Sequence, residues 1–184
     1  MASHEAACAD DRVAVARGIA QTAAMTDAHH LYVDADACPV KAEAAKVAER
    51  HGWPVVFVAN MGMQVPRGRR VRLEVVSGGF DAADDWIAER AKAGDVVVTA
   101  DIPLASRCLK AGARVLGPSG KRFTGDNIGN ALAMRELSAD LRAYGVGGGP
   151  PPFGPRDRSR FLQELENLVQ EAKRAPQGLA VRRS

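Results

Sequence analysis

The sequence predicts a three-layer α/β/α fold with a mostly parallel central sheet, followed by C-terminal helices. From residue 31 onward, short apolar segments alternate with longer amphipathic ones. Several of the amphipathic segments end at a glycine, the residue that most often follows a helix. The run Val96–Val98 is continuous in β-branched residues, which is typical of a strand buried on both faces. Together these features predict strands joined by helices that cover the sheet.

The predicted elements follow one another in a regular order. The expected strands span residues 31–35, 54–60, 71–79, 95–101 and 113–118. The expected helices between them span residues 39–52, 80–94 and 102–112. Pro39 is placed in the first helical position, where the missing N–H of proline costs nothing. Glycines at positions 52 and 94 are expected to end the first two helices.

Beyond Pro118 the pattern changes to two helices separated by a Gly/Pro-rich hinge at residues 145–155. The helix over 124–145 has an apolar stripe of Ile128, Leu132, Leu137 and Leu141. The helix over 156–174 has a stripe of Phe161, Leu165, Leu168 and Ala172. We expect both helices to pack on the sheet domain or on a partner. In the second case the protein would form an oligomer through these helices.

The length of 184 residues suits one domain with a tail at each end. We expect a flexible N-terminal extension at 1–28, an α/β domain with its helical extension at 29–174, and a basic tail at 175–184. The first 28 residues lack the pattern of a signal peptide, and no apolar run is long enough to span a bilayer.

Charge and cysteine content narrow the class of protein further. The formal charge of +3 permits an anionic partner without requiring one. Cys8, Cys38 and Cys108 are widely spaced and form no CxxC pair. Neither a disulfide framework nor a structural zinc site is therefore expected, and a reducing cytoplasm is the simple expectation.

Polar residues lie at the carboxyl ends of four of the expected strands. They are Asp34 and Asp36, then Asn60, then Ser77, and then Thr99 and Asp101. Because the carboxyl ends of parallel strands share one edge of the sheet, these residues are expected to meet in the crevice there.

The helix after the third strand adds further carboxylates. With Phe80, Ile87 and Ala91 as its buried stripe, Asp84 lies on the face that meets the sheet. A carboxylate in that position is costly without a counter-charge. Asp81 belongs to the first turn, where it either stabilises the helix N-terminus or joins the cluster.

These aspartates predict a metal site. Carboxylates so close together do not all stay ionised without a cation. Oxygen ligands without His or Cys favour a hard ion, Mg²⁺ or Mn²⁺. We expect Asp34, Asp84, Asp101 and Asp81 to bind the metal, and Asp34, Asp36, Asp84 and Asp101 to form the catalytic set.

Around this set we expect substrate-binding groups. Asn60, Ser77 and Thr99 offer neutral oxygens at the same edge, and Lys41 follows the first Asp pair. Arg67 and Arg69 belong to a basic segment before the third strand, which is either a solvated face or a contact for nucleic acid.

Several motifs in fixed order carry a family resemblance. They are "YVDADACPV", "VVFVAN", "SGGFDAADDWI", "GDVVVTADIPLA", "KRFTGDNI" and "RDRSRFLQELE". Over about residues 30–174 the chain resembles the YaiI/YqxD family of uncharacterised bacterial proteins. That family in turn resembles the PIN-like superfamily, which contains many metal-dependent ribonucleases.

The superfamily resemblance implies roles for individual residues. Asp34 matches the Asp that ends the first strand, and Glu43 is the nearest match to the next acidic position. Asp84, three residues before Ile87, matches the third acid, and Thr99 with Asp101 match a T-x-D pattern. Asp36 departs from the superfamily, where Ser, Thr or Asn is more usual, and Asp81 is additional.

Three functions follow as hypotheses. The first is a Mg²⁺- or Mn²⁺-dependent phosphodiesterase that acts on RNA. The second is a phosphatase of the haloacid-dehalogenase type, suggested by the D-x-D of Asp34 and Asp36, although Ala-Cys-Pro replaces the usual Gly-Thr after it. The third is a non-catalytic RNA-binding module that uses a metal for structure.

Overall fold

The computed structural model describes residues 29–36, 38–79, 81–144 and 153–174. The predicted N-terminal extension, the basic tail and residues 145–152 of the hinge lie outside the described residues. Within the described part, no helix is both long and apolar enough to cross a membrane.

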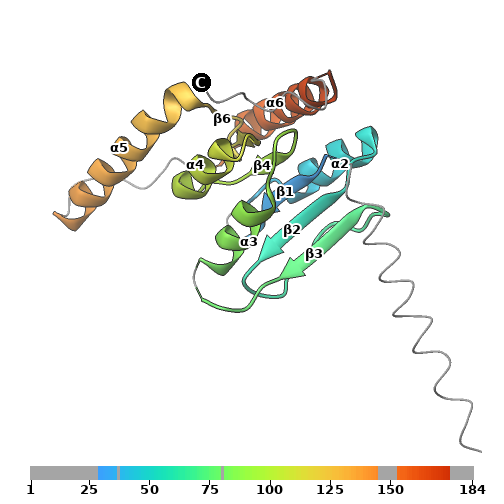
Figure 1. The fold of residues 1–184 in the computed structure, drawn as a ribbon, viewed down its shortest axis with the longest axis horizontal. Helices are drawn as coiled ribbons and strands as arrows, with labels where there is room; N and C mark the ends of the chain where they lie inside the picture. Colours follow the sequence, from blue (N-terminus) through green and yellow to red (C-terminus); the bar gives the residue numbers. More distant parts are fainter. Residues whose placement is uncertain (1–28, 37, 80, 145–152, 175–184) are drawn as a thin grey trace, which may run out of the picture.

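A six-stranded sheet forms the centre of the molecule (Figure 1). Its strands are β1 (Leu31–Asp34), β2 (Val55–Ala59), β3 (Val71–Val75), β4 (Val96–Val98), β5 (Arg114–Leu116) and β6 (Arg122–Phe123). Their order in the sheet is β3-β2-β1-β4-β5-β6. The first five strands run parallel, as predicted, and β6 pairs antiparallel with β5. The two-residue strand β6 was not predicted, because it is too short to show a hydrophobic period.

Helices cover both faces of this sheet, which confirms the three-layer architecture (Figure 1). They are α2 (Lys41–His51), α3 (Ala82–Arg90), α4 (Ile102–Lys110), α5 (Gly125–Ala143) and α6 (Pro155–Arg174). Successive strand residues alternate between two cores. Val33 and Phe57 pack under α2 and α6, whereas Tyr32 and Val56 pack under α3 and α4.

The C-terminal helix α6 is part of the domain core. The predicted stripe of Phe161, Leu165, Leu168 and Ala172 is buried against α2 and the sheet. The loop after β5 approaches α6 so closely that a Cβ on Gly120 would lie 2.8 Å from the backbone nitrogen of Phe161. Gly120 also has φ +78°, a conformation that glycine adopts without strain. The position therefore requires glycine.

Several predicted helix boundaries differ from the structure, and two of the differences have a clear cause. Helix α2 begins at Lys41 instead of Pro39, because Pro39 and Val40 form a turn that precedes it. Helix α3 ends at Arg90, before Gly94, because Ala91 is extended at φ −63° and ψ 130°. The buried carboxylate of Asp95 then accepts the backbone N–H of Lys92 at 3.0 Å and so fixes the turn that follows.

Helix α5 packs on the domain only near its beginning. Ile128 contacts the core beneath α4. Leu137 and Leu141, which the sequence placed on a buried stripe, are 51% and 41% exposed. The second half of α5 projects from the body of the molecule (Figure 1). The predicted packing is thus confirmed for α6 and for only the first part of α5.

Candidate functional site

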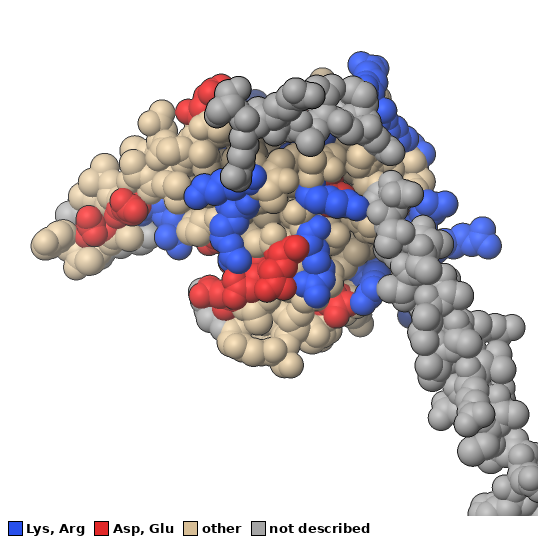
Figure 2. Space-filling view, in the orientation of Figure 1, with Lys and Arg blue, Asp and Glu red and all other residues tan. Residues whose placement is uncertain are grey.

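The predicted polar residues do gather at the carboxyl edge of the parallel strands. Asp34 is the last residue of β1, Asn60 directly follows β2, and Thr99 directly follows β4. Because β1 lies between β2 and β4, these three residues are neighbours across the sheet. We call Asp34, Asp36, Asp81, Asp84 and Asp101 the acidic edge. Acidic side chains gather over α3, with Lys and Arg side chains on both sides of them (Figure 2).

The Thr99 hydroxyl joins Asp34 to Asp101. Thr99 Oγ1 donates to Asp34 Oδ2 at 2.9 Å and accepts the backbone N–H of Asp101 at 2.9 Å. Asp101 Oδ1 in turn accepts the backbone N–H of Leu104 at 2.8 Å and caps α4. The end of strand β4 and the start of α4 therefore fix the positions of the Asp34 and Asp101 carboxylates. The T-x-D spacing allows this, because it brings the Thr99 hydroxyl to the backbone N–H of Asp101.

Asp34 is the most buried carboxylate of the acidic edge, with 6% of the residue exposed. Burial raises the pKa of its carboxyl group, and the charges of Asp36 and Asp101 raise it further, whereas the hydrogen bond from Thr99 lowers it. A buried carboxylate with two acidic neighbours is the arrangement that a bound cation stabilises.

Asp36 connects three segments instead of pointing into the sheet core. It is exposed, and its Oδ2 accepts the backbone N–H of Asn60 at 2.9 Å. Asn60 Oδ1 accepts the backbone N–H of Ala83 at 3.3 Å. Asp36 and Asn60 thereby tie the loop after β1 to the end of β2 and the start of α3, and they hold Asp84 beside the edge.

Asp84 shows the repulsion within the acidic edge most clearly. Burial and, to a smaller extent, the charges of Asp101, Asp34 and Asp81 together raise the pKa of its carboxyl group to about 6. The charge of Arg107 lowers this pKa, but Arg107 also pairs with Asp85 at 2.7 Å. Asp81 is exposed at the N-cap of α3, where its side chain makes no capping hydrogen bond.

This repulsion gives a testable dependence of stability on pH. The Asp84 carboxyl has a pKa of 3.8 when unperturbed and about 6 in the folded protein. The folded state therefore binds more protons between these values, and its stability falls as the pH rises through them. In EDTA, Asp84→Asn is expected to be more stable than wild type at neutral pH, by on the order of 1 kcal/mol after allowance for solvent screening. Near pH 4 the difference is expected to vanish.

Urea unfolding of both proteins across this pH range measures the effect. Asp85→Asn is the matched control, because Asp85 lies next in the chain but is exposed and paired with Arg107. An Asp84→Asn protein with the same pH dependence as wild type would contradict the assignment.

The donor set of the acidic edge fits a hard divalent ion. The five side chains of the acidic edge offer only oxygen donors, and Arg135 Nη2 lies 3.9 Å from Asp101 Oδ2. In the positions that the side chains adopt here, however, no three described His, Cys, Asp or Glu residues are arranged to share one ion. Asp101 has one oxygen committed to the α4 cap, so a shared ion requires side-chain rotation.

Glu43 adds a buried carboxylate beneath this edge. It is 7% exposed, and one of its oxygens pairs with Arg158 of α6. Its Oε2 is buried without a hydrogen-bond partner in the described structure. Burial, with smaller contributions from the charges of Asp34 and Glu43, raises the pKa of the Cys38 thiol to about 11, so Cys38 lies near both carboxylates. A thiol with that pKa is protonated at neutral pH and is a poor nucleophile.

Within the described structure, Lys41 binds two backbone carbonyl groups and not a carboxylate. Its Nζ donates to the backbone carbonyls of Ala35 at 2.6 Å and Cys38 at 3.0 Å. It closes the loop after β1 and so supports the positions of Asp34 and Asp36. The predicted contact between Lys41 and a substrate phosphate stays a prediction.

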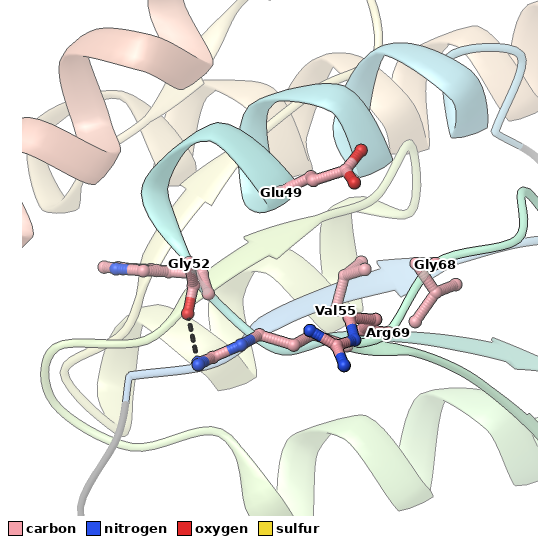
Figure 3. Close-up of a pocket in the computed structure, with 8 residues that line it drawn as sticks. Glu49, Gly52, Val55, Gly68 and Arg69 are labelled. Carbon is pink, nitrogen blue, oxygen red and sulfur yellow. Dashed lines mark hydrogen bonds between the residues drawn. The ribbon is translucent and has the colours of Figure 1, made fainter.

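Arg67 and Arg69 are not at the acidic edge. They precede Val71, which pairs with Val55 at the amino ends of β3 and β2. Arg69 lines a small pocket of about 170 Å³ there, together with Glu49, Gly52 and Gly68 (Figure 3). A five-residue strand separates this edge from the carboxyl edge by roughly 16 Å. Ser77 follows the carboxyl end of β3. There it lines a hollow beside α3, together with Asp81 and Asp85.

Sequence reasoning missed Arg135 as a neighbour of the site. Arg135 belongs to α5, which begins more than twenty residues beyond Asp101, and its helix shows no local sign of contact with the acidic edge. Its position follows only from the packing of α5 against α4.

Comparison with known proteins identifies the same family that the sequence motifs resemble. The model of the uncharacterized YaiI/YqxD family matches residues 32–171. The chain belongs to the YaiI/YqxD family. It is 59% identical over 146 residues to a UPF0178 protein of Azorhizobium caulinodans, covering 79% of this chain and 92% of that relative.

Two further relatives are similarly close to this YaiI/YqxD protein. One from Rhizobium meliloti is 60% identical over 145 residues, covering 78% of this chain and 99% of the relative. One from Rhodopseudomonas palustris is 56% identical over 152 residues, covering 82% of this chain and 96% of the relative. No solved structure matches the chain.

Proposed function

We propose that this protein is a divalent-metal-dependent phosphodiesterase that cleaves RNA. The observation that carries the proposal is the convergence of Asp34, Asp84 and Asp101 at the carboxyl edge of a parallel sheet, where the charge of Asp101 helps to raise the pKa of both Asp34 and Asp84. Ligands of open α/β folds bind at this edge. The resemblance to PIN-like proteins supports the same function, as an analogy.

In this proposal the residues have distinct roles. Asp34, Asp84 and Asp101 would hold Mg²⁺ or Mn²⁺, with Asp81 beside them at the rim. A bound ion in such a site supplies charge for the phosphoryl oxygens and a more acidic water. Thr99 positions Asp34 through its hydroxyl, and Asp36 positions the start of α3 through Asn60.

Cleavage of labelled single-stranded RNA tests the proposal. Wild-type protein is expected to cleave the strand with Mn²⁺ or Mg²⁺ and to stop in EDTA. Asp101→Asn is expected to lose at least about a hundredfold in rate, because a metal contributes several kcal/mol to stabilising the transition state. The Asn side chain still accepts the N–H of Leu104, so the α4 cap is preserved.

Asp85→Asn is the matched control, with unchanged cleavage expected. If Asp101→Asn cleaves as fast as wild type, cleavage at this edge is refuted. Release of phosphate from p-nitrophenyl phosphate, with a phosphorylated Asp34 and no RNA cleavage, would instead support the phosphatase. RNA binding without turnover by either protein would support the binding module.

A further inference from the structure

Two hollows flank the acidic edge, and they differ in charge. The hollow beside α3, of about 550 Å³, is lined by Asp81, Asp85 and Glu89 along with Arg90. The hollow between the start of α4 and α5, of about 440 Å³, includes Lys121 and Arg135, and none of the described residues that line it is acidic. We call the second hollow the α4–α5 groove. A polyanion is repelled by the first hollow and attracted by the second.

The α4–α5 groove opens directly onto the acidic edge. Ala100 and Ile102, the neighbours of Asp101 in the chain, are part of its lining. Arg135 Nη2 lies 3.9 Å from Asp101 Oδ2, and about half of the Arg135 side chain is exposed. A guanidinium in this position reaches both the carboxylate and a phosphate that lies next to it.

The groove also offers apolar surface. Met134 on α5, which is 60% exposed, and Ile102 on α4, which is half-buried, both line it. Lys121 Nζ lies 5.9 Å from the ring centre of Phe123, which also lines the groove. A base contacts an apolar wall of this kind only when it is unstacked, as in a single strand. The volume falls in the range of small-ligand sites.

We propose that the α4–α5 groove binds a nucleotide of a single-stranded nucleic acid beside the phosphate to be cleaved, with Arg135 and Lys121 contacting successive phosphates. The inference rests on the proposed function, because that function places the cleaved phosphate at the acidic edge. It assigns the substrate contacts to α5 and to the loop residue just before β6, and not to the arginines at the opposite edge of the sheet.

Binding of a fluorescein-labelled oligouridine to the full-length protein tests the inference. All variants carry Asp34→Asn, so that the probe is not cleaved, and anisotropy is recorded as KCl is raised. Arg135→Gln and Lys121→Gln are each expected to weaken binding about tenfold, the size of one charged hydrogen bond. Each is also expected to lower the slope of log K against log salt by about 0.7. Arg135→Lys is expected to restore most of the loss.

Two control variants make the result specific. Lys110→Gln, at the other end of α4, removes an exposed cation away from the groove and is expected to leave affinity and salt slope unchanged. Arg69→Gln tests the amino edge, with the same expectation. Unchanged binding by Arg135→Gln and Lys121→Gln, loss confined to Arg69→Gln, or no binding by any variant would each overturn the inference.

Failure of the proposed function is recognised separately. It appears as absent RNA cleavage by wild-type protein with Mn²⁺, while the groove variants still lose oligouridine binding. If the wild-type protein cleaves RNA and both groove variants bind oligouridine as tightly as the parent protein, the proposed function holds and the groove inference fails.

Discussion

Asp34→Asn is expected to abolish the stabilisation of the protein by Mn²⁺. At an ion concentration about a hundred times the Kd, a bound ion adds about 2.7 kcal/mol, which corresponds to a rise in Tm of about 5–10 °C. Asp34 is the most buried carboxylate of the acidic edge, and its neighbours oppose its ionisation. The variant is expected to show no rise in Tm, measured by thermal unfolding with Mn²⁺ and with EDTA.

The same variant is expected to fold normally without metal. The Asn oxygen still accepts the hydrogen bond from Thr99, and the loss of a buried charge removes repulsion from Asp36 and Asp101. The metal-free Tm is therefore expected to equal or exceed that of wild type. Asp85→Asn is expected to keep the full Mn²⁺ response. An Mn²⁺-induced rise in the Asp34→Asn protein equal to that of wild type would remove Asp34 from the metal site.

Phe161→Ala is expected to destabilise the protein by about 3–5 kcal/mol, the usual cost of such a cavity. Phe161 is fully buried where α6 packs on α2 and the sheet. The same packing holds Arg158 next to Glu43, so the substitution is also expected to loosen this ion pair. Urea unfolding in EDTA measures the free energy.

Leu137→Ala on α5 provides the comparison for Phe161→Ala. Leu137 is 51% exposed, so a change within about 0.5 kcal/mol is expected. A loss below about 1 kcal/mol for Phe161→Ala would show that α6 contributes little to the stability of the domain. A large loss for Leu137→Ala would show that the exposed half of α5 is buried in solution.

The alternation of strands and helices made the fold predictable, because each element carries its own hydrophobic period. The limits of α2 and α3 were less predictable, since they depend on tertiary contacts. Lys41 closes the turn that contains Pro39, and Asp95 binds the turn after α3. Neither contact has a signature in the local sequence.

The acidic edge was predictable for a topological reason. Parallel strands bring Asp34, Asn60 and Thr99 to one side of the sheet whatever the detail of their loops. The basic groups were not predictable in the same way. Arg67 and Arg69 precede a strand and so belong to the other edge. Arg135 reaches Asp101 only through the packing of α5 on α4.

The role of Asp36 also required the structure. The sequence predicts both Asp34 and Asp36 in the catalytic set, and only Asp34 of the two as a metal ligand. Asp34 ends the strand in a buried position, whereas Asp36 is exposed and accepts the N–H of Asn60. The second aspartate therefore holds the loop and α3 in place beside the first.

The rate of RNA cleavage by the EDTA-treated wild-type protein, measured as Mn²⁺ is titrated back, tests the central claim most directly. The proposed function predicts a rate that rises from background and saturates, and an Asp101→Asn protein that stays at background throughout. A rate that does not depend on Mn²⁺, or one that Asp101→Asn reproduces in full, would contradict it.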